Sequence, residues 1–434
     1  MMTKRHLMPP VALLTVLPTI AIAQDGRIDV ADSGDTAWLL AAAVLSFLTV
    51  PGIALFHAGR IHRRNAGSVM LQCLGIMALV SVLWVTVGYT LAFGQASGGW
   101  LGQGNAWMLM TLGNVRGDTA VPESAFALFQ LSFAVLAPAL MTGAWAERAR
   151  FGWVMAFAGM WSLVVYAPVA HWIWGGGWVA TGVGTLDWAG GIVVNLTAGV
   201  SSLAVAAMLG RRKGQTKGDN AAPSPLLALT GGALLWIGWL AMIGGSALAA
   251  SDDAAAAIIA GHVAAAAGAL VWGLLERMTA GTCSLIGVAT GAVAGLASIS
   301  AGAGYVSPGA AIVIGAIGGG ACYFATRLMR GKLAFVDDAL GIMAVHGIGG
   351  AVGAALLAPF LAERLGGVGY GQGMNAIAQV VAQGVGITVV TAWAAVASVI
   401  LAVMASIVFP MRVSEETESL GLDIATHGAP GSRD

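Results

Sequence analysis

The sequence predicts an all-α polytopic membrane protein with eleven transmembrane helices. Of the 434 residues, 58% are hydrophobic and only 9% are charged, so a water-soluble fold would lack polar residues for its surface. Apolar stretches of about 20 residues, the length that spans a bilayer, recur with short connections between them. Arginine and lysine are concentrated in alternate connections, as in a protein that crosses a membrane many times.

The first 23 residues are typical of a secretory signal. A short basic region precedes an apolar core, and Ala21-Ile22-Ala23 before Gln24 forms an A-x-A cleavage site. An uncleaved first helix is the alternative, but the apolar core is short and Pro18 interrupts it. We therefore expect a cleaved signal peptide at 1–23, a transmembrane domain at 24–410 and a cytoplasmic tail at 411–434.

The apolar stretches predict spanning helices at 37–58, 68–93, 122–146, 151–173, 189–209, 225–248, 253–275, 282–300, 308–328, 339–361 and 384–409. If the mature amino terminus is outside, the inner segments hold fifteen lysines and arginines and the outer segments hold three. This asymmetry is what the positive-inside rule requires of a correct helix count. The odd number of helices places the carboxyl terminus inside.

An internal repeat relates the fifth and tenth predicted helices. The segment Val194-Asn195-Leu196-Thr197-Ala198-Gly199 matches Val345-His346-Gly347-Ile348-Gly349-Gly350, and Asp187 and Asp338 each precede the matched polar residue by eight positions. Because equivalent positions are five helices apart, the sequence predicts two inverted five-helix repeats plus a final helix. Such repeats place a transport path near the membrane midplane, where we expect Asn195 and His346 to face each other.

Polar side chains within predicted helices mark candidate functional positions, because burying them in a bilayer is costly unless they are paired or line a wet cavity. The repeat favours a role for Asn195 and His346 in lining a path. His262 has no such support, and we interpret it as a helix-packing residue.

Aromatic residues gather at the expected outer membrane interface, between Ala170 and Gly177. Anchoring at the interface is the usual role of tryptophan at this depth. Alternatively, the indole of Trp174 attracts an ammonium-like cation while the hydroxyl of Ser246 accepts a hydrogen bond from it. Phe129 and Phe133, one helical turn apart, would face the same vestibule, or else lie in the core or against lipid.

Asp187 and Asp338 lie at helix ends, where a carboxylate either caps backbone amides or acts on a substrate electrostatically. The sequence contains no P-loop, HExxH or GxSxG motif, and its net charge of zero excludes a nucleic-acid footprint. Cys73, Cys283 and Cys322 have no metal-ligand spacing, and we expect all three to be buried. We predict no enzyme activity, metal or cofactor.

Several segments together resemble the ammonium transporter family (Amt, Mep and Rh), in its bacterial Amt form, over nearly the whole chain. They are Val50 to Phe56, Gly143 to Arg148, Ala170 to Gly177, Asp187 to Gly191, and Val345 to Gly347. The resemblance implies a homotrimer in the inner (plasma) membrane, with a narrow hydrophobic pore in each subunit that carries ammonium or ammonia, and methylammonium too.

When the roles of family residues are assigned to the matching positions of this sequence, the resemblance implies a role for each candidate residue. Phe129, Trp174 and Ser246 recruit the cation, and Phe133 and Met242 form the gate. Asn195 and His346 occupy the pore centre, and Asp187 and Asp338 give electrostatic support. The tail, with Gly421-Leu422-Asp423, resembles a regulatory region at which a PII signalling protein docks in bacterial members.

The sequence departs from the family at three positions. Asn195 replaces the first of two pore histidines, Met242 replaces the second gate phenylalanine, and Gly341 stands where an aspartate is common. Because asparagine does not titrate, a direct relay between two imidazoles is excluded, and we expect altered selectivity or proton coupling. The alternative function is an ammonium sensor that signals through its cytoplasmic face with little flux.

Overall fold

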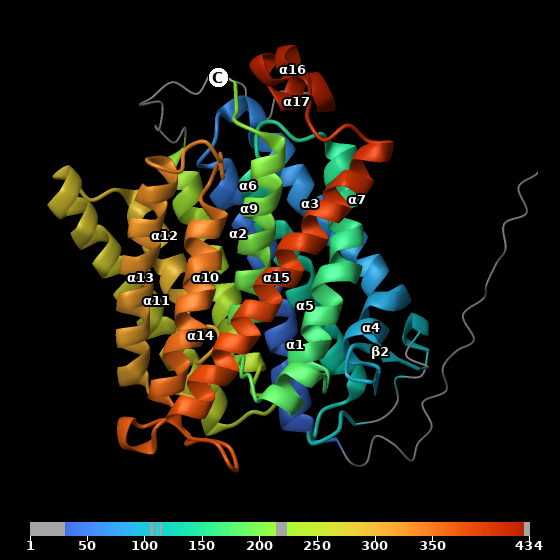
Figure 1. Cartoon of the computed structure of the whole chain (residues 1–434), viewed down its shortest axis with the longest axis vertical. Coiled ribbons are helices and arrows are strands. Elements are labelled where there is room, and N and C mark those ends of the chain that lie inside the picture. The colour runs from blue at the N-terminus through green and yellow to red at the C-terminus, as the bar shows by residue number, and fades with distance from the viewer. Residues whose placement is uncertain (1–30, 105–106, 111, 113–114, 214–223, 429–434) are drawn as a thin grey trace, which may run out of the picture.

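The computed structural model describes residues 31–104, 107–110, 112, 115–213 and 224–428, so the predicted signal peptide lies outside it. The helices run side by side along one axis and form a single bundle (Figure 1). A hairpin of β1 (Gln95–Ser97) and β2 (Leu101–Gln103) lies toward one end, and the tail helices α16 (Glu415–Leu420) and α17 (Leu422–His427) cap the other. We call these the hairpin end and the tail end.

Within the described residues, ten helical spans are long and apolar enough to cross a membrane. They are Ser33–Ala58, Arg63–Phe93, Glu123–Trp145, Phe151–Trp174, Gly191–Leu209, Pro225–Gly245, Asp252–Ala280, Pro308–Arg330, Met343–Phe360 and Ala376–Val408. The apolar helix α12 (Leu285–Ile299), with 15 residues, corresponds to the predicted eighth span. Every predicted helix therefore has a counterpart, and the all-α polytopic class is confirmed.

Several predicted helix bounds differ from the structure, among them the end of α11 (Asp252–Ala280), which was predicted at 275, and three differences have a local reason. The last helix, α15 (Ala376–Val408), begins eight residues before the predicted 384, because the side chain of Asn375 accepts hydrogen bonds from the amides of Ile377 and Ala378. The predicted tenth helix begins at Met343 rather than 339, after Gly341 takes a left-handed φ of 76°. The predicted first helix is divided into two helices, α1 (Ser33–Ser46) and α2 (Thr49–Ala58).

The remaining α-helices divide the other spans as follows. They are α3 (Ala66–Leu83), α4 (Tyr89–Phe93), α5 (Glu123–Leu140), α6 (Thr142–Trp145), α7 (Phe151–Trp161), α8 (Ala167–Trp174), α9 (Thr197–Leu209), α10 (Pro225–Gly245), α11 (Asp252–Ala280), α13 (Pro308–Arg330) and α14 (Ile348–Phe360). Short 3₁₀ turns occupy Arg63–Asn65, Trp107–Leu109 and Glu363–Leu365.

Among the described residues, five segments widen into π-helix, a form that is rare and often found at functional sites. They are η2 (Trp84–Gly88), η4 (Ser162–Tyr166), η5 (Val179–Val183), η6 (Gly191–Leu196) and η7 (Met343–Gly347). The last two carry Asn195 and His346, the residues that the sequence repeat singles out.

Glycine contacts bring the helices that carry these two residues together. An added Cβ at Gly199 would collide with the backbone of Gly347, and one at Gly350 would lie 3.1 Å from the Cβ of Asn195. Small residues of this kind allow membrane helices to approach closely. The position of Asn195 relative to His346 is therefore fixed by backbone packing.

The prediction that all three cysteines are buried is wrong for Cys283, which is exposed. It lies in the connection between α11 and α12 rather than within a helix. Cys73 and Cys322 are buried, as predicted.

The tail is held to the bundle through the start of α3. The carboxylate of Asp423 accepts hydrogen bonds from the amides of Gly67 (3.0 Å) and Ser68 (2.7 Å). The side chain of Asn65 accepts another from the amide of Leu422 at 2.9 Å. An otherwise unsatisfied helix start thus serves as the docking point of the tail.

Asp423→Ala is expected to release the tail. Losing two hydrogen bonds to a carboxylate costs about 2 kcal/mol, roughly 30-fold in the docking equilibrium. Trypsin cleavage after Arg412 should accelerate accordingly, followed on gels with the protein in detergent micelles. Glu416→Ala is the control, because Glu416 is an exposed residue of the same tail. Equal cleavage rates in the two variants would contradict this account of docking.

Candidate functional site

Asn195 and His346 form a buried hydrogen-bonded pair. The distance from His346 Nδ1 to Asn195 Oδ1 is 2.8 Å, and both residues are almost fully buried. The amide nitrogen of Asn195 donates to the carbonyl of Gly190 at 3.0 Å, so its oxygen must accept from the histidine. Nδ1 of His346 therefore carries the hydrogen, and Nε2 presents a lone pair.

Trp239 holds the imidazole in place from one side. Its ring stacks on His346 with 6.0 Å between centroids and 9° between planes. The indole nitrogen donates to the hydroxyl of Ser300 at 3.0 Å, which fixes the tryptophan in turn. The imidazole is thus oriented on one face before any substrate arrives.

The two π-helices start in the same way, with an aspartate followed three residues later by a left-handed glycine. Asp187 accepts four backbone hydrogen bonds of 2.7–3.0 Å, from residues 190 to 193. Asp338 accepts one of 2.8 Å from Met343, and its other oxygen is buried without a partner in the described chain. Gly190 and Gly341 have φ of 89° and 76°. The glycine at 341 thus has a backbone role that an aspartate would fill less easily.

The structure gathers the predicted aromatic residues into one cluster toward the hairpin end. Phe129 and Phe133 meet edge-on at 5.3 Å, and Phe133 meets Trp174 edge-on at 5.2 Å. Phe129 and Phe133 are buried, which excludes the lipid-facing alternative. The indole nitrogen of Trp174 donates to the backbone carbonyl of Asp187 at 2.6 Å, so the cluster is joined to the start of η6.

Ser246 and Met242 lie on α10 and its carboxyl end, beside this cluster. The ring of Phe129 packs against Gly245, the neighbour of Ser246. The Ser246 hydroxyl donates to the carbonyl of Met242 at 2.9 Å, which leaves its oxygen lone pairs free to accept. Rings and a hydroxyl acceptor are groups that suit a small cation with N–H donors.

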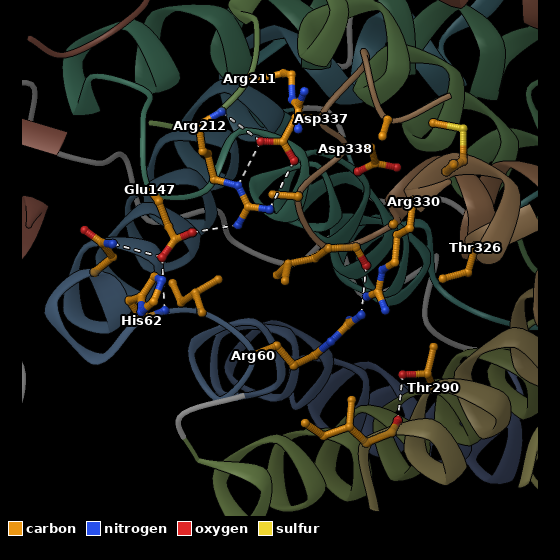
Figure 2. A pocket seen from close by; sticks show the side chains of 18 of the residues that line it. Arg60, His62, Glu147, Arg211, Arg212, Thr290, Thr326, Arg330, Asp337 and Asp338 are labelled. Atoms are coloured by element: carbon orange, nitrogen blue, oxygen red, sulfur yellow. Dashed lines mark hydrogen bonds and ion pairs between the residues drawn. The ribbon is translucent and has the colours of Figure 1, made fainter. Parts of the chain in front are cut away.

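At the tail end, a cavity of about 1090 Å³ is lined in part by Asp338. Figure 2 shows its centre, where Arg212 bridges two carboxylates. The guanidinium lies 2.6 Å from Glu147 and 2.9 Å from Asp337. Burial raises the pKa of both carboxyls, but the charge and hydrogen bonds of Arg212 outweigh it and lower the pKa below the ordinary 4.5 and 3.8.

Arg212→Gln is expected to destabilise the protein by about 3 kcal/mol at pH 7, because it leaves the buried carboxylate of Glu147 without an ion pair and leaves Asp337 with only the longer contact of 4.0 Å to Arg148. Since folding depresses both carboxyl pKa values, the stabilisation is complete above about pH 5 and is lost as pH falls through the lowered values. Thermal unfolding in micelles across this range measures both effects, and the variant should show a flatter pH profile. Lys213→Gln is the control, because its ion pair with Glu415 is solvent-exposed (51% and 75%). Equal losses in both variants would contradict a special role for the buried network.

Sequence reasoning missed the Arg212 network, Trp239 and His57, a third buried histidine at the end of α2. The sequence signal for His57 was a titratable residue within an apolar stretch, directly after the segment that ends at Phe56. Among the described residues, no group of three histidine, cysteine or acidic side chains is placed to hold a metal ion.

Comparison with known proteins gives one family. The model of the Ammonium Transporter Family matches residues 37–432. The ammonium transporter of Bacillus subtilis is 39% identical over 412 residues, which cover 92% of this chain and 99% of the relative. That of Aquifex aeolicus is 38% identical over 421 residues, 96% of both chains.

Solved structures of proteins with similar names have the same fold as this chain. A structure described as a sensor Amt protein superposes with a TM-score of 0.84 at 27% identity, covering 92% of this chain and 98% of the other. Mep2 of Candida albicans superposes with a TM-score of 0.82 at 31% identity, covering 89% and 88%. The bundle of this chain is therefore the one that those proteins share.

Proposed function

Since this chain belongs to the ammonium transporter family, we propose that it carries ammonium or ammonia across the membrane past the aromatic cluster and the Asn195–His346 pair. It is a multi-pass protein of the plasma membrane and is not an enzyme. The observation that carries the proposed path is the buried hydrogen bond between Asn195 and His346. This bond keeps Nε2 of His346 unprotonated, so Nε2 can accept a hydrogen bond from an N–H of a substrate that has lost its water.

Recruitment is assigned to Phe129, Trp174 and Ser246. The rings attract the cation by their quadrupoles, and the Ser246 oxygen accepts one of its N–H groups. Phe133 and Met242 then admit only a species stripped of water. The cation therefore gives its proton to a water molecule of the vestibule beside the rings, and neutral ammonia continues. The Asp187 carboxylate is occupied by four amides, and it acts as a positioning group and a source of negative potential.

Current measurement on a solid-supported membrane tests this function with purified protein in vesicles. An ammonium pulse should give uptake, with or without a current, and this response should exceed the response to an equal potassium pulse. Ammonium binding without uptake would overturn transport and establish the alternative, an ammonium sensor. That alternative is favoured by the resemblance to the solved sensor Amt protein, whereas the curated relatives at higher identity are named transporters.

Asn195→His is expected to improve discrimination against potassium by about tenfold. A second imidazole would exclude water from the pore centre, so a hydrated ion would lose more of its shell there, and 1.4 kcal/mol corresponds to tenfold. The ratio of ammonium to potassium flux measures this. Met242→Phe tests the gate separately in the same assay. An unchanged ratio in Asn195→His would show that asparagine does not set selectivity.

The family also supports proposals about assembly and orientation. We propose a homotrimer, testable by light scattering in detergent, and a tail that offers a docking surface to a PII signalling protein, testable by pull-down with tail-deleted protein as control. The two similar aspartate–glycine–π-helix segments support the inverted repeat, and the distribution of lysine and arginine supports an outside amino terminus. Protease protection of the tail in sealed cells tests that orientation.

A further inference from the structure

His57 has an acceptor nitrogen that has no hydrogen-bond partner in the described chain. Its Nδ1 lies 3.0 Å from the hydroxyl of Thr142, which itself donates to the carbonyl of Ala139 at 2.8 Å. The threonine oxygen must therefore accept, and Nδ1 of His57 carries the hydrogen. Nε2 presents a lone pair, and it is buried without a hydrogen-bond partner in the described chain. Such an acceptor costs free energy that a donor from a substrate would recover.

The unsatisfied nitrogen lies between His346 and the cavity at the tail end. A Cβ added to Gly143 would lie 3.0 Å from Nε2 of His57 and 2.6 Å from Cδ1 of Ile342, so these two side chains meet there. Ile342 is one turn before His346, at the entry to η7. One turn beyond His57, Arg60 lines the cavity. A solute that leaves His346 toward the cavity therefore passes His57.

Asn195 offers such a solute less than an imidazole would. One N–H of its amide donates to Gly190 and one oxygen lone pair accepts from His346, so its amide is held by these two bonds, and it has no imidazole nitrogen to present. The two histidines are different, because each has its Nδ1–H bound to a fixed acceptor and its Nε2 lone pair free of partners in the described chain. His57 and His346 thus present the same chemistry in succession.

We propose that Nε2 of His57 accepts a hydrogen bond from ammonia after it passes His346, and so supplies the second imidazole that Asn195 does not. This inference rests on the proposed transport function. The positive charge of Arg60 at the cavity wall disfavours a cation at this point, so the neutral molecule is the species received. A packing role for His57 predicts instead that its ring never contacts substrate.

Flux in proteoliposomes of the full chain tests the proposal. His57→Phe should lower ammonium flux about tenfold, the equivalent of one lost hydrogen bond of about 1.4 kcal/mol, while His57→Gln, which keeps an amide oxygen acceptor, should stay within about threefold of wild type. His171→Phe is the matched control, because His171 is also buried, binds a backbone carbonyl through Nδ1 and has an unpartnered Nε2. Wild-type flux in His57→Phe would overturn the proposal.

Solid-state NMR of ¹⁵N-histidine-labelled protein in vesicles covers the case in which His57→Phe fails to fold. The Nε2 resonance of His57, identified by its loss in His57→Gln, should shift when ammonium is added and stay fixed when potassium is added. A packing role would leave it unmoved, and that result would overturn the proposal. Absent flux in wild type would refute the transport function itself, whereas wild-type flux with an unmoved resonance would refute only the role of His57.

Discussion

His346→Ala is expected to lower ammonium flux by about 5- to 150-fold, which corresponds to the loss of about 1–3 kcal/mol when a desolvated N–H has no acceptor. The change also removes the stacking partner of Trp239 and leaves the Asn195 oxygen unpaired. Uptake by proteoliposomes at matched protein density measures the flux. Retained flux would show that the path avoids this pair.

A second substitution separates the two nitrogens of His346. His346→Asn can still donate to Asn195 through its shorter amide, but it has no group at the position of Nε2. If Nε2 is the substrate acceptor, this variant should be as slow as His346→Ala while its thermal midpoint stays closer to wild type. His262→Ala is the control, because His262 is exposed and packs beside Trp236, with 5.3 Å between ring centroids. Faster flux in His346→Asn than in His346→Ala would assign the role to Nδ1 instead.

The helices were predictable because the membrane imposes a simple rule on composition and length. The repeat also predicted that Asn195 and His346 face each other, and the structure places them in hydrogen-bond contact. Both inferences use properties that lie along the chain, such as hydropathy and spacing. The same information predicted the aromatic residues that gather around Phe133, but not whether they face lipid or protein.

The sequence could not predict which charged residues pair when they come from connections that are far apart in the chain. Glu147, Arg212 and Asp337 come from three different connections, and no spacing rule relates them. The left-handed turns at Gly190 and Gly341 are equally hidden, because glycine is abundant throughout the chain and most of it serves helix contact. His57 was missed because it has no counterpart in the repeat, and its significance depends on the hydroxyl of Thr142 in another helix.

Asp187→Ala is expected to destabilise the protein by about 4 kcal/mol or more. The four amides at the start of η6 would lose their acceptor inside the bundle, and each buried donor left unsatisfied costs about 1–3 kcal/mol, partly offset by water that enters. The thermal midpoint in micelles measures the loss. Asp338→Ala is the control from the matching segment. The Asp338 carboxylate accepts one backbone hydrogen bond, of 2.8 Å, so this variant should lose clearly less stability. Equal losses would contradict capping as the main role of Asp187.

Asp187→Asn then distinguishes capping from attraction of the cation. An asparagine oxygen can accept from part of the amide set, but its NH₂ group faces the remaining donors, so stability should fall to between wild type and Asp187→Ala. If capping is the main role, flux per folded protein should fall in step with stability, because η6 carries Asn195. A fully stable Asp187→Asn protein with lost ammonium flux would instead show that the negative charge acts on the cation directly. That result would mean that the four amides stabilise the buried negative charge. It would also mean that the main role of Asp187 is to recruit the cation and not to support the helix.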